Sequence, residues 1–434
     1  MWFLYDLIIK FFGCAVCIAA LFNKKARKWM QGRKDFSSKL TDFTTVQLSN
    51  CPTVVWFHCA SLGEFEQGRP VIEAFREEHP DWKIIVTFFS PSGYEIRKNY
   101  PGADHIFYLP IDTPRNARNF IDLINPSLVI FVKYEYWFRY LDELYRRNIP
   151  VYFISAIFRD NQHFFRWYGG WALKQLKKIT GFFVQDDASA QLLRRHGIDR
   201  VTVSGDTRFD RVAAIAENAK AYPEVGKFVS GSPVFLAGST WPADEEMILH
   251  LIEEAGYRVK FIIAPHEVGR ERVEALREKV IGRQSSVASR RIESGTMEQW
   301  NNGTILFSEL NGENAAGAGV LIIDGIGYLS HLYRYATIAF IGGGFGVGIH
   351  NILEAATFGK PVIFGPNYHK FREAEELVEE GGAFPVENAQ QLNNRTIELL
   401  TDPVLLQKTS AICSAYVMKK KGATGRILSE IKLS

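Results

Sequence analysis

The chain has 434 residues and a hydrophobic content of 47%, which is enough for two α/β domains with substantial cores. Its formal net charge of +3 does not suggest a nucleic-acid-binding protein. The charge is uneven, because residues 1–205 carry 27 Lys and Arg against 20 Asp and Glu, so we expect an anionic partner to meet the first half. The five cysteines lack the neighbouring ligands of a metal set, which favours a reduced, cytoplasmic chain.

The N-terminal segment, residues 2–22, is almost entirely apolar and long enough to cross a bilayer. Its two charged residues, Asp6 and Lys10, are four positions apart and can pair on one helix. A basic stretch with Trp29 follows, which is typical of the cytoplasmic, anionic-lipid side of a membrane. We predict that residues 1–34 are a membrane-anchor helix with a basic flank. A spanning helix, an interfacial helix and a buried core helix all fit this pattern.

After a polar connector, the chain alternates short β-branched or aromatic runs with helix-period segments, which predicts doubly wound parallel sheets. The expected strands are 54–59, 83–89, 105–110, 127–132, 150–155, 181–185 and 201–205, and then 233–238, 259–265, 320–324, 337–342 and 361–365. The helices expected in the first half are 66–79, 92–99, 114–124, 136–147, 165–178 and 186–196.

The restart of the strand pattern at residue 233 predicts two similar α/β lobes. We expect a first domain over residues 35–205 and a second over residues 206–411. Residues 404–430 have a helical pattern, and we expect residues 412–434 to pack back onto the first domain.

Glu64 is the leading catalytic candidate, because it follows the strand VVWFHC at the edge of the sheet where open α/β folds bind ligands. A carboxylate at a helix N-terminus is kept ionised by the helix dipole, which suits a general base. A role as a simple helix cap fits its position equally well.

Two further strand ends predict residues of the same cleft. Pro91, Ser92 and Gly93 follow one strand, and Glu135 follows another. Glu135 is also compatible with a structural role, as a buried carboxylate paired with Lys133, Arg139 or another base.

In the second half, Ser239 and Thr240 again join a strand end to a helix start, where backbone N–H groups can hold a phosphate. His266, after the strand ending in IIAP, and Arg208, in GDTRFD, are possible additional donors. Both are equally compatible with surface or hinge positions.

The stretch from Gly342 to Pro366 carries the strongest signal, because an apolar run ends at Gly342, Gly343 and Gly344 and a helix-like segment follows. Glycines let backbone N–H groups approach a phosphate, and a helix start adds its dipole. Asn351 and Glu354, three apart on one helical face, can hold the hydroxyls of a ribose or sugar. An ordinary strand-to-helix turn is the alternative.

The sequence lacks Asp-x-Asp, HExxH and Walker motifs, so we expect neither a metal cofactor nor NTPase chemistry. Residues 163–179 mix aromatic with basic side chains. This segment fits either a surface that binds a membrane or a phosphorylated lipid, or a core helix with a solvated basic face.

Several separated motifs, in order, resemble the 3-deoxy-D-manno-octulosonic acid (Kdo) transferases of lipopolysaccharide assembly, over about residues 1 to 415. They are WFHCASLGE, VTFFSPSGYE, GDTRFD, GSTWPADEE and GGGFGVGIHNILEAATFGKPVIFGPNYHKFREAEELVEEGGA. The resemblance implies a GT-B fold with an N-terminal membrane anchor. In this fold two Rossmann-like domains face a central cleft, and the first would bind the acceptor and the second the donor.

The resemblance also implies an activity: inverting, metal-independent transfer of Kdo from CMP-Kdo to a lipid A precursor, at the cytoplasmic face of the bacterial inner membrane. Glu64 would take the proton of the acceptor hydroxyl. The turn at 342–344, with Ser239 and Thr240, would stabilise the departing phosphate. Asn351 and Glu354 would hold the ribose. The expected partners are CMP-Kdo, a lipid A precursor and an anionic membrane surface.

The chain departs from the family pattern at three places. Lys133 stands where a second carboxylate is common, Trp241 where a His is frequent, and His266 lacks the Arg that usually accompanies it. Two other functions stay open: a nucleotide-sugar epimerase of the same architecture, and a membrane-anchored, non-catalytic scaffold that binds nucleotide sugars. The anchor and the basic aromatic segment argue against the epimerase.

Overall fold

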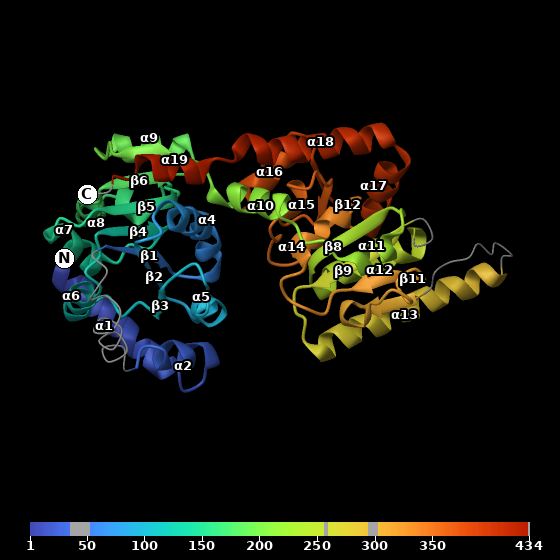
Figure 1. Ribbon diagram of the computed structural model, residues 1–434, viewed down its shortest axis with the longest axis horizontal. Helices are drawn as coiled ribbons and strands as arrows, with labels where there is room; N and C mark the ends of the chain where they lie inside the picture. The colour runs from blue at the N-terminus through green and yellow to red at the C-terminus, as the bar shows by residue number, and fades with distance from the viewer. Residues whose placement is uncertain (35–52, 256–258, 294–302, 433–434) are drawn as a thin grey trace. The chain divides into compact units, whose positions relative to one another are not determined.

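The computed structural model describes residues 1–34, 53–255, 259–293 and 303–432. The chain forms two compact units (Figure 1). Unit 1 comprises Met1–Arg211 together with Lys420–Ser434, and unit 2 comprises Val212–Lys419. The first crossing therefore falls inside a helix, α10 (Thr207–Glu217), and the chain returns to unit 1 at the end of α18 (Pro403–Lys420). Sequence reasoning had placed these points at residues 205/206 and 411/412.

Unit 1 is built on a parallel sheet, with seven strands among the described residues, in the order β3-β2-β1-β4-β5-β6-β7. The strands are β1 (Val54–Cys59), β2 (Lys83–Phe88), β3 (His105–Tyr108), β4 (Leu128–Val132), β5 (Val151–Ala156), β6 (Gly181–Val184) and β7 (Val201–Val203). The predicted strands are all present. In the central strands β1 and β4 the β-branched and aromatic runs are buried on both faces, whereas the edge strands β3 and β7 are only partly buried.

The helices of unit 1 follow the strands as crossover connections. They are α4 (Leu62–Glu78), α5 (Pro91–Arg97), α6 (Pro114–Ile124), α7 (Phe138–Arg146), η1 (His163–Phe165), α8 (Gly170–Leu176) and α9 (Asp187–Arg195). Side-chain alternation along β1 divides the core into two layers. Trp56 points to a cluster with α6 and α7, whereas Val55 and Phe57 point to α4.

Unit 2 repeats this plan, with the described strands in the order β10-β11-β9-β8-β12-β13-β14, all parallel. They are β8 (Val234–Thr240), β9 (Lys260–Pro265), β10 (Gly303–Leu306), β11 (Ala318–Ile322), β12 (Ile338–Ile341), β13 (Val362–Phe364) and β14 (Ala383–Pro385). The sequence did not predict β10 and β14, the two edge strands.

The helices of unit 2 pack on both sides of its sheet, and one cluster joins β8 to α12, α13 and α17. The bounds are α11 (Pro223–Val229), α12 (Pro242–Ala255), α13 (Arg270–Glu293), η2 (Phe307–Glu309), α14 (Leu329–Leu332), η3 (Tyr333–Tyr335), α15 (Leu353–Ala356), α16 (Arg372–Glu379) and α17 (Ala389–Thr401). The described fold is thus the predicted pair of doubly wound α/β domains.

The N-terminal residues form α1 (Trp2–Ala19) and α2 (Lys24–Gln31), both in unit 1. By length and composition α1 is able to cross a membrane. One side of α1 contacts the unit: Asp6 accepts two hydrogen bonds from the Arg139 guanidinium, at 2.8 and 2.5 Å. This corrects the expected pairing of Asp6 with Lys10. The other side is apolar and exposed, with Phe3 81% and Phe11 67% accessible.

The C-terminal helix α19 (Ala423–Glu430) belongs to unit 1. Ile427 is fully buried in the same cluster as Val55 and Phe57. Asp210, in α10, accepts hydrogen bonds from the backbone N–H and hydroxyl of Thr424 at 2.7 and 2.9 Å. The last helix therefore packs onto the first domain, as the sequence predicted for that end of the chain.

Candidate active site

Glu64 and Glu135 lie at the switch point of the unit 1 sheet, where β1 and β4 are neighbours although β2 and β3 come between them in sequence. Ligands of open α/β sheets bind at the carboxyl ends of such strands. Glu64 is in the first turn of α4, directly after β1, and Glu135 follows β4. Ser90, which caps α5 after β2, donates its backbone N–H to the Ala60 carbonyl at 2.7 Å. The topology thus brings three predicted strand ends together.

Glu64 is held by its own turn, since its Oε2 accepts a hydrogen bond from the Ala60 N–H at 2.5 Å. Burial, and then the neighbouring Glu135, raise the pKa of Glu64 to about 7. The bonds from Ala60 and Ser61 and the charge of Lys133 act in the opposite direction. The sequence argument that the helix dipole keeps Glu64 ionised is therefore wrong, because burial outweighs it. A carboxyl with a pKa near 7 is nevertheless suited to general-base work at neutral pH.

Glu135 lies beside a buried histidine rather than beside Lys133 or Arg139. Its Oε2 is 3.6 Å from His58 Nε2, and the His58 side chain is fully buried. Trp137 donates its indole N–H to the same Nε2 at 3.2 Å, so that nitrogen accepts. The proton of the neutral ring then lies on Nδ1, 2.8 Å from the hydroxyl of Thr87. Glu135 thus joins a polar network that begins on β1.

Lys133, between β4 and Glu135, adopts a left-handed backbone conformation with φ 62°. Such a conformation is unfavourable for a side chain with a Cβ, and strain of this kind is concentrated at functional sites. Its ammonium group lies 5.7 Å from the Tyr134 ring and lowers the pKa of Glu64. The lysine that replaces the family's carboxylate therefore acts electrostatically on the candidate base.

Arg208 belongs to unit 1, in the first turn of α10, and not to the unit that carries the glycine turn. Its guanidinium pairs with Asp206, at 2.8 Å from Nε and 2.7 Å from Nη2. Its charge, like that of Glu64, acts on the pKa of Tyr134, so it lies on the same side of unit 1 as the candidate base. The structure therefore groups Arg208 with Glu64.

In unit 2 the switch point lies between β8 and β12, and the predicted residues occur there. Ser239 and Thr240 end β8, and Gly342 follows β12. Ser239 has φ 55°, at a register shift between β8 and β9. The Thr240 hydroxyl donates to Glu245 at 3.1 Å, and its side chain is buried. Of the two hydroxyls, the Ser239 side chain is the more accessible.

The glycine turn differs from the prediction in its geometry. No helix follows it directly, because α15 begins only at Leu353. Gly342 donates its N–H to the Gly238 carbonyl at 2.9 Å, and Gly343 donates to the Asp244 carboxylate at 2.8 Å. The N–H group of Gly343 is thus bonded to a buried carboxylate of the protein itself. Burial raises the pKa of Asp244, although the N–H groups that bond to it act in the opposite direction.

Close packing explains why this turn contains glycines. A Cβ on Gly342 would lie 2.3 Å from the Ser239 carbonyl oxygen, and one on Gly344 would lie 2.5 Å from the backbone N of Gly365. Both distances are far below van der Waals contact, so only glycine fits. The glycines bring the chain after β12 against the ends of β8 and β13.

Three aromatic rings cover this strand edge, and the sequence had identified only one of them as a donor. The His266 ring stacks on Trp241 and on His350, at centroid distances of 4.6 and 4.5 Å. Trp241 donates its indole N–H to His350 Nε2 at 3.0 Å, so the Nδ1–H of the neutral ring is a donor. Burial, and then the charge of His266, lower the pKa of His350. The position of His350 directly after the glycine turn is the sequence signal that could have identified this residue.

Asn351 and Glu354 lie close together, but not in the first turns of one helix. The Asn351 amide donates to Glu354 Oε1 at 3.3 Å, and its carbonyl oxygen accepts the Leu353 N–H at 3.1 Å. Asn351 therefore precedes α15, and Glu354 is inside it. The pair remains a compact set of donors and acceptors beside His350.

The segment 163–179 combines both of its predicted alternatives. Phe164 and Leu176 are buried in the core, and Trp171 packs edge-on against Trp2 of α1 at 5.0 Å. Trp167 and Tyr168 are 95% and 57% accessible. This exposed aromatic pair lies in the turn between η1 and α8, and the basic residues Lys174 and Lys177 of the same segment are exposed as well.

Comparisons with known proteins agree with this architecture. A family model for 3-deoxy-D-manno-octulosonic-acid transferase matches residues 31–211. A 3-deoxy-D-manno-octulosonic acid transferase of Aquifex aeolicus is 27% identical over 366 residues, which are 83% of this chain and 89% of the relative. The Haemophilus influenzae protein of the same name is 25% identical, over 88% of this chain and 87% of its own.

Among solved structures, the UDP-GlcNAc 2-epimerase of Neisseria meningitidis has a TM-score of 0.58 at 18% identity, covering 87% of this chain and 99% of the epimerase. MurG of Acinetobacter baumannii has a TM-score of 0.54 at 11% identity, with coverages of 87% and 98%. At these identities the likeness concerns the fold, which is the GT-B pair of α/β domains. In sequence, the chain is similar over more than four fifths of its length to the Kdo transferases of lipopolysaccharide assembly.

Proposed function

We propose that this enzyme transfers Kdo from CMP-Kdo to a lipid A precursor of the lipid IVA type, with inversion and without a metal ion, at the cytoplasmic face of the bacterial inner membrane. The observation that carries the proposal is Glu64: a carboxyl at the carboxyl end of β1 with a pKa of about 7. Such a group is ionised often enough at neutral pH to accept a proton, and basic enough to hold it.

In the proposed reaction an acceptor hydroxyl loses its proton to the Glu64 carboxylate as its oxygen bonds to the anomeric carbon of Kdo. The bond from that carbon to the phosphate oxygen breaks, and CMP leaves with the electron pair. Burial raises the pKa of Glu64 most, Glu135 raises it further, and Lys133 lowers it.

Unit 2 supplies the groups proposed to hold the donor. The Nδ1–H of His350 and the Ser239 hydroxyl are suited to the phosphate or the Kdo carboxylate. Asn351 and Glu354 are suited to the ribose hydroxyls. The backbone N–H groups of Gly342 and Gly343 are not included, because they already bond within the protein.

The test is the Glu64→Gln variant, assayed with CMP-Kdo and lipid IVA by mass spectrometry of the products. We expect kcat to fall by about 10²–10⁴-fold, because general-base catalysis contributes that much, while CMP affinity changes little. Asp81→Asn, a change at another unit 1 carboxylate, is the control. Undiminished transfer by Glu64→Gln would exclude Glu64 as the base.

Two further arms separate the alternatives. If the protein is a transferase, incubation of CMP-Kdo without lipid acceptor should give no epimerised nucleotide sugar. A non-catalytic scaffold would produce no glycolipid with or without the lipid acceptor. Addition of EDTA should leave the transfer rate unchanged. A loss of activity that divalent cations restore would show that the proposed metal-independent mechanism is wrong.

A further inference from the structure

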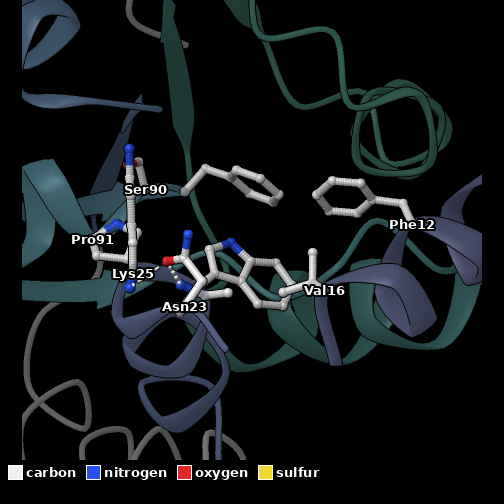
Figure 2. A pocket seen from close by; sticks show the side chains of 9 residues that line it. Phe12, Val16, Asn23, Lys25, Ser90 and Pro91 are labelled. Carbon is white, nitrogen blue, oxygen red and sulfur yellow. Dashed lines mark hydrogen bonds between the residues drawn. The ribbon is translucent and has the colours of Figure 1, made fainter. Parts of the chain in front are cut away.

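An apolar cavity of about 280 Å³ lies in unit 1 between α1, α2 and the turn that follows β2. Phe12 and Val16 line it from α1, Trp29 lines it from α2, and Phe89 lines it from the turn. Figure 2 shows Phe12 and Val16 on one side, with Ser90 and Pro91 on the other. The volume equals that of roughly nine water molecules in the liquid, enough for a short stretch of alkyl chain.

The rim of the cavity is polar and positively charged. Lys25 and Ser90 lie there, and Lys25 is exposed. Lys24 and Lys28, on the same short helix, are exposed as well, and the first turn of α2 contains no acidic residue. An apolar interior beneath a cluster of cations matches an amphiphile with an alkyl chain and an anionic headgroup.

The surroundings favour a lipid over a small soluble ligand. The exposed apolar side of α1 includes Ile18, and Leu21 and Phe22 follow it in the turn before α2. These three side chains are 64%, 68% and 88% accessible. A helix with such a side lies in the boundary of a lipid layer, where alkyl chains are the prevailing apolar molecules. An alkyl chain of a membrane lipid would therefore reach the cavity without passing through water.

The wall of the cavity is also connected to the candidate base. Ser90 donates its N–H to the Ala60 carbonyl at 2.7 Å, and Ala60 donates its own N–H to Glu64 at 2.5 Å. Phe89 packs on Trp137, at 4.5 Å between ring centroids. Trp137 bonds to His58, which lies beside Glu135. The cavity and both carboxylates therefore share one strand-end layer of unit 1.

We propose that this cavity is an acyl-chain subsite for the lipid acceptor: it takes one alkyl chain of that anionic lipid and so positions the acceptor hydroxyl at Glu64. The proposal rests on the proposed function and adds a recognition element to it. The alkyl chain makes apolar contacts with the cavity, and the lysines of α2 attract the anionic headgroup.

The test fills the cavity with the variant Val16→Trp, and with Val16→Phe as a graded change. We expect the KM for the acylated acceptor to rise about tenfold with Trp and less with Phe, with kcat and the KM for CMP-Kdo nearly unchanged. A deacylated acceptor should show the same KM with all variants. Ile18→Trp, on the exposed side of α1, is the matched control and should behave as wild type. Equal melting temperatures establish that the variants fold.

A second experiment measures the binding of the lipid acceptor in the absence of sugar transfer. A lipid IVA analogue with a diazirine at the end of one acyl chain should cross-link to the residues that line the cavity, and Val16→Trp should abolish this. Binding to phosphatidylglycerol vesicles should not change in Val16→Trp, whereas a parallel loss would assign the cavity to bulk lipid and overturn the proposal. An unchanged KM in Val16→Trp, or an equal rise in Ile18→Trp, would also overturn it. If wild type cross-links at the cavity but transfers no sugar, the proposed function fails and the subsite stands.

Discussion

Glu64 is subject to opposing influences: burial and Glu135 raise its pKa, whereas Lys133 lowers it. Because the proposed reaction needs the ionised form of Glu64, kcat/KM should rise with pH and reach half of its plateau near pH 7. Lys133→Met removes the cation and should move this midpoint to higher pH. A pH–rate profile of both proteins, with Lys174→Met at an exposed lysine as the control, tests the assignment. An unshifted midpoint in Lys133→Met would contradict it.

The same shift carries a stability consequence. The folded state holds the pKa of Glu64 at about 7, above its ordinary value of 4.5, so folding favours the protonated form. The stability that this group contributes is complete below pH 4.5 and is lost as pH rises through about 7. Glu64→Gln is always neutral and should therefore be more stable than wild type at pH 8, by about 1–3 kcal/mol. Calorimetry at pH 8 and pH 4 checks this, because the gain should nearly vanish at the lower pH.

Sequence reasoning placed the candidate residues along the fold better than it described their surroundings. It placed Glu64, Glu135, Ser239 and Thr240 at strand ends, because strand ends follow from local patterns. It did not identify Asp244 as the partner of Gly343, or His350 as the partner of Trp241. Those contacts join residues 99 and 109 positions apart, and such pairing depends on the register of β8 against β12.

The glycine turn after β12 shows how one element departs from its pattern. The sequence from Gly342 predicted a helix immediately after the strand, yet Gly348 has φ 139°, which no helix accommodates. The turn therefore continues as a loop, and α15 is a single turn. By contrast, α6 was predicted with its observed bounds, because Thr113 caps it, Pro114 begins it and Asn125 ends it in a left-handed conformation.

Close approach at this turn gives a test of the packing argument. In Gly342→Ala the new methyl group would lie 2.3 Å from the Ser239 carbonyl oxygen, so the backbone must move. We expect a loss of about 1–3 kcal/mol from the stability of unit 2. In Gly346→Ala the new methyl group would lie 3.6 Å from the Gly343 carbonyl oxygen, an ordinary contact, so this control should be close to wild type. Thermal melting of the two variants distinguishes a steric requirement from mere turn propensity.

The contact of α1 with the rest of unit 1 combines the pair formed by Asp6 and Arg139 with the packing of Trp2 on Trp171. Asp6→Asn removes the charge, and we expect the attachment to weaken by about 1.5 kcal/mol, or roughly tenfold in the detached population. Limited proteolysis in detergent should then cleave after α1 correspondingly faster. Lys10→Gln, at an exposed residue, should leave the rate unchanged. Equal cleavage rates for both variants would show that the ion pair of Asp6 and Arg139 does not hold α1 on unit 1.

At the level of the two units, the sequence predicted the architecture because both sheets repeat one pattern of buried strand and crossover helix. It missed β14, which has three residues, and β10, which lies at the other edge of its sheet. Edge strands are short and half-exposed, so their periodicity is weak. It also did not predict that the first crossing lies inside α10, because a continuous helical pattern gives no sign of a boundary.

Because the chain returns to unit 1 at its C-terminal helix α19, a mutation in this helix should destabilise unit 1 and not unit 2. Ile427→Ala should remove fully buried contacts from the core of unit 1 and destabilise that unit by about 2–5 kcal/mol. Hydrogen exchange should accelerate in α4 and stay unchanged in α12 of unit 2. Val404→Ala, at a side chain that is 76% accessible, is the control. Equal acceleration in both units would show that they unfold together.

Since both chain ends lie in unit 1, unit 2 is one uninterrupted insert, Val212–Lys419, whereas unit 1 is assembled from two pieces. A gene fragment for the insert alone encodes a complete sheet and its helices, but no single fragment encodes the whole of unit 1. Chimeras between related enzymes should therefore exchange the insert as a cassette with two junctions, and a one-junction swap would leave unit 1 with a foreign α19.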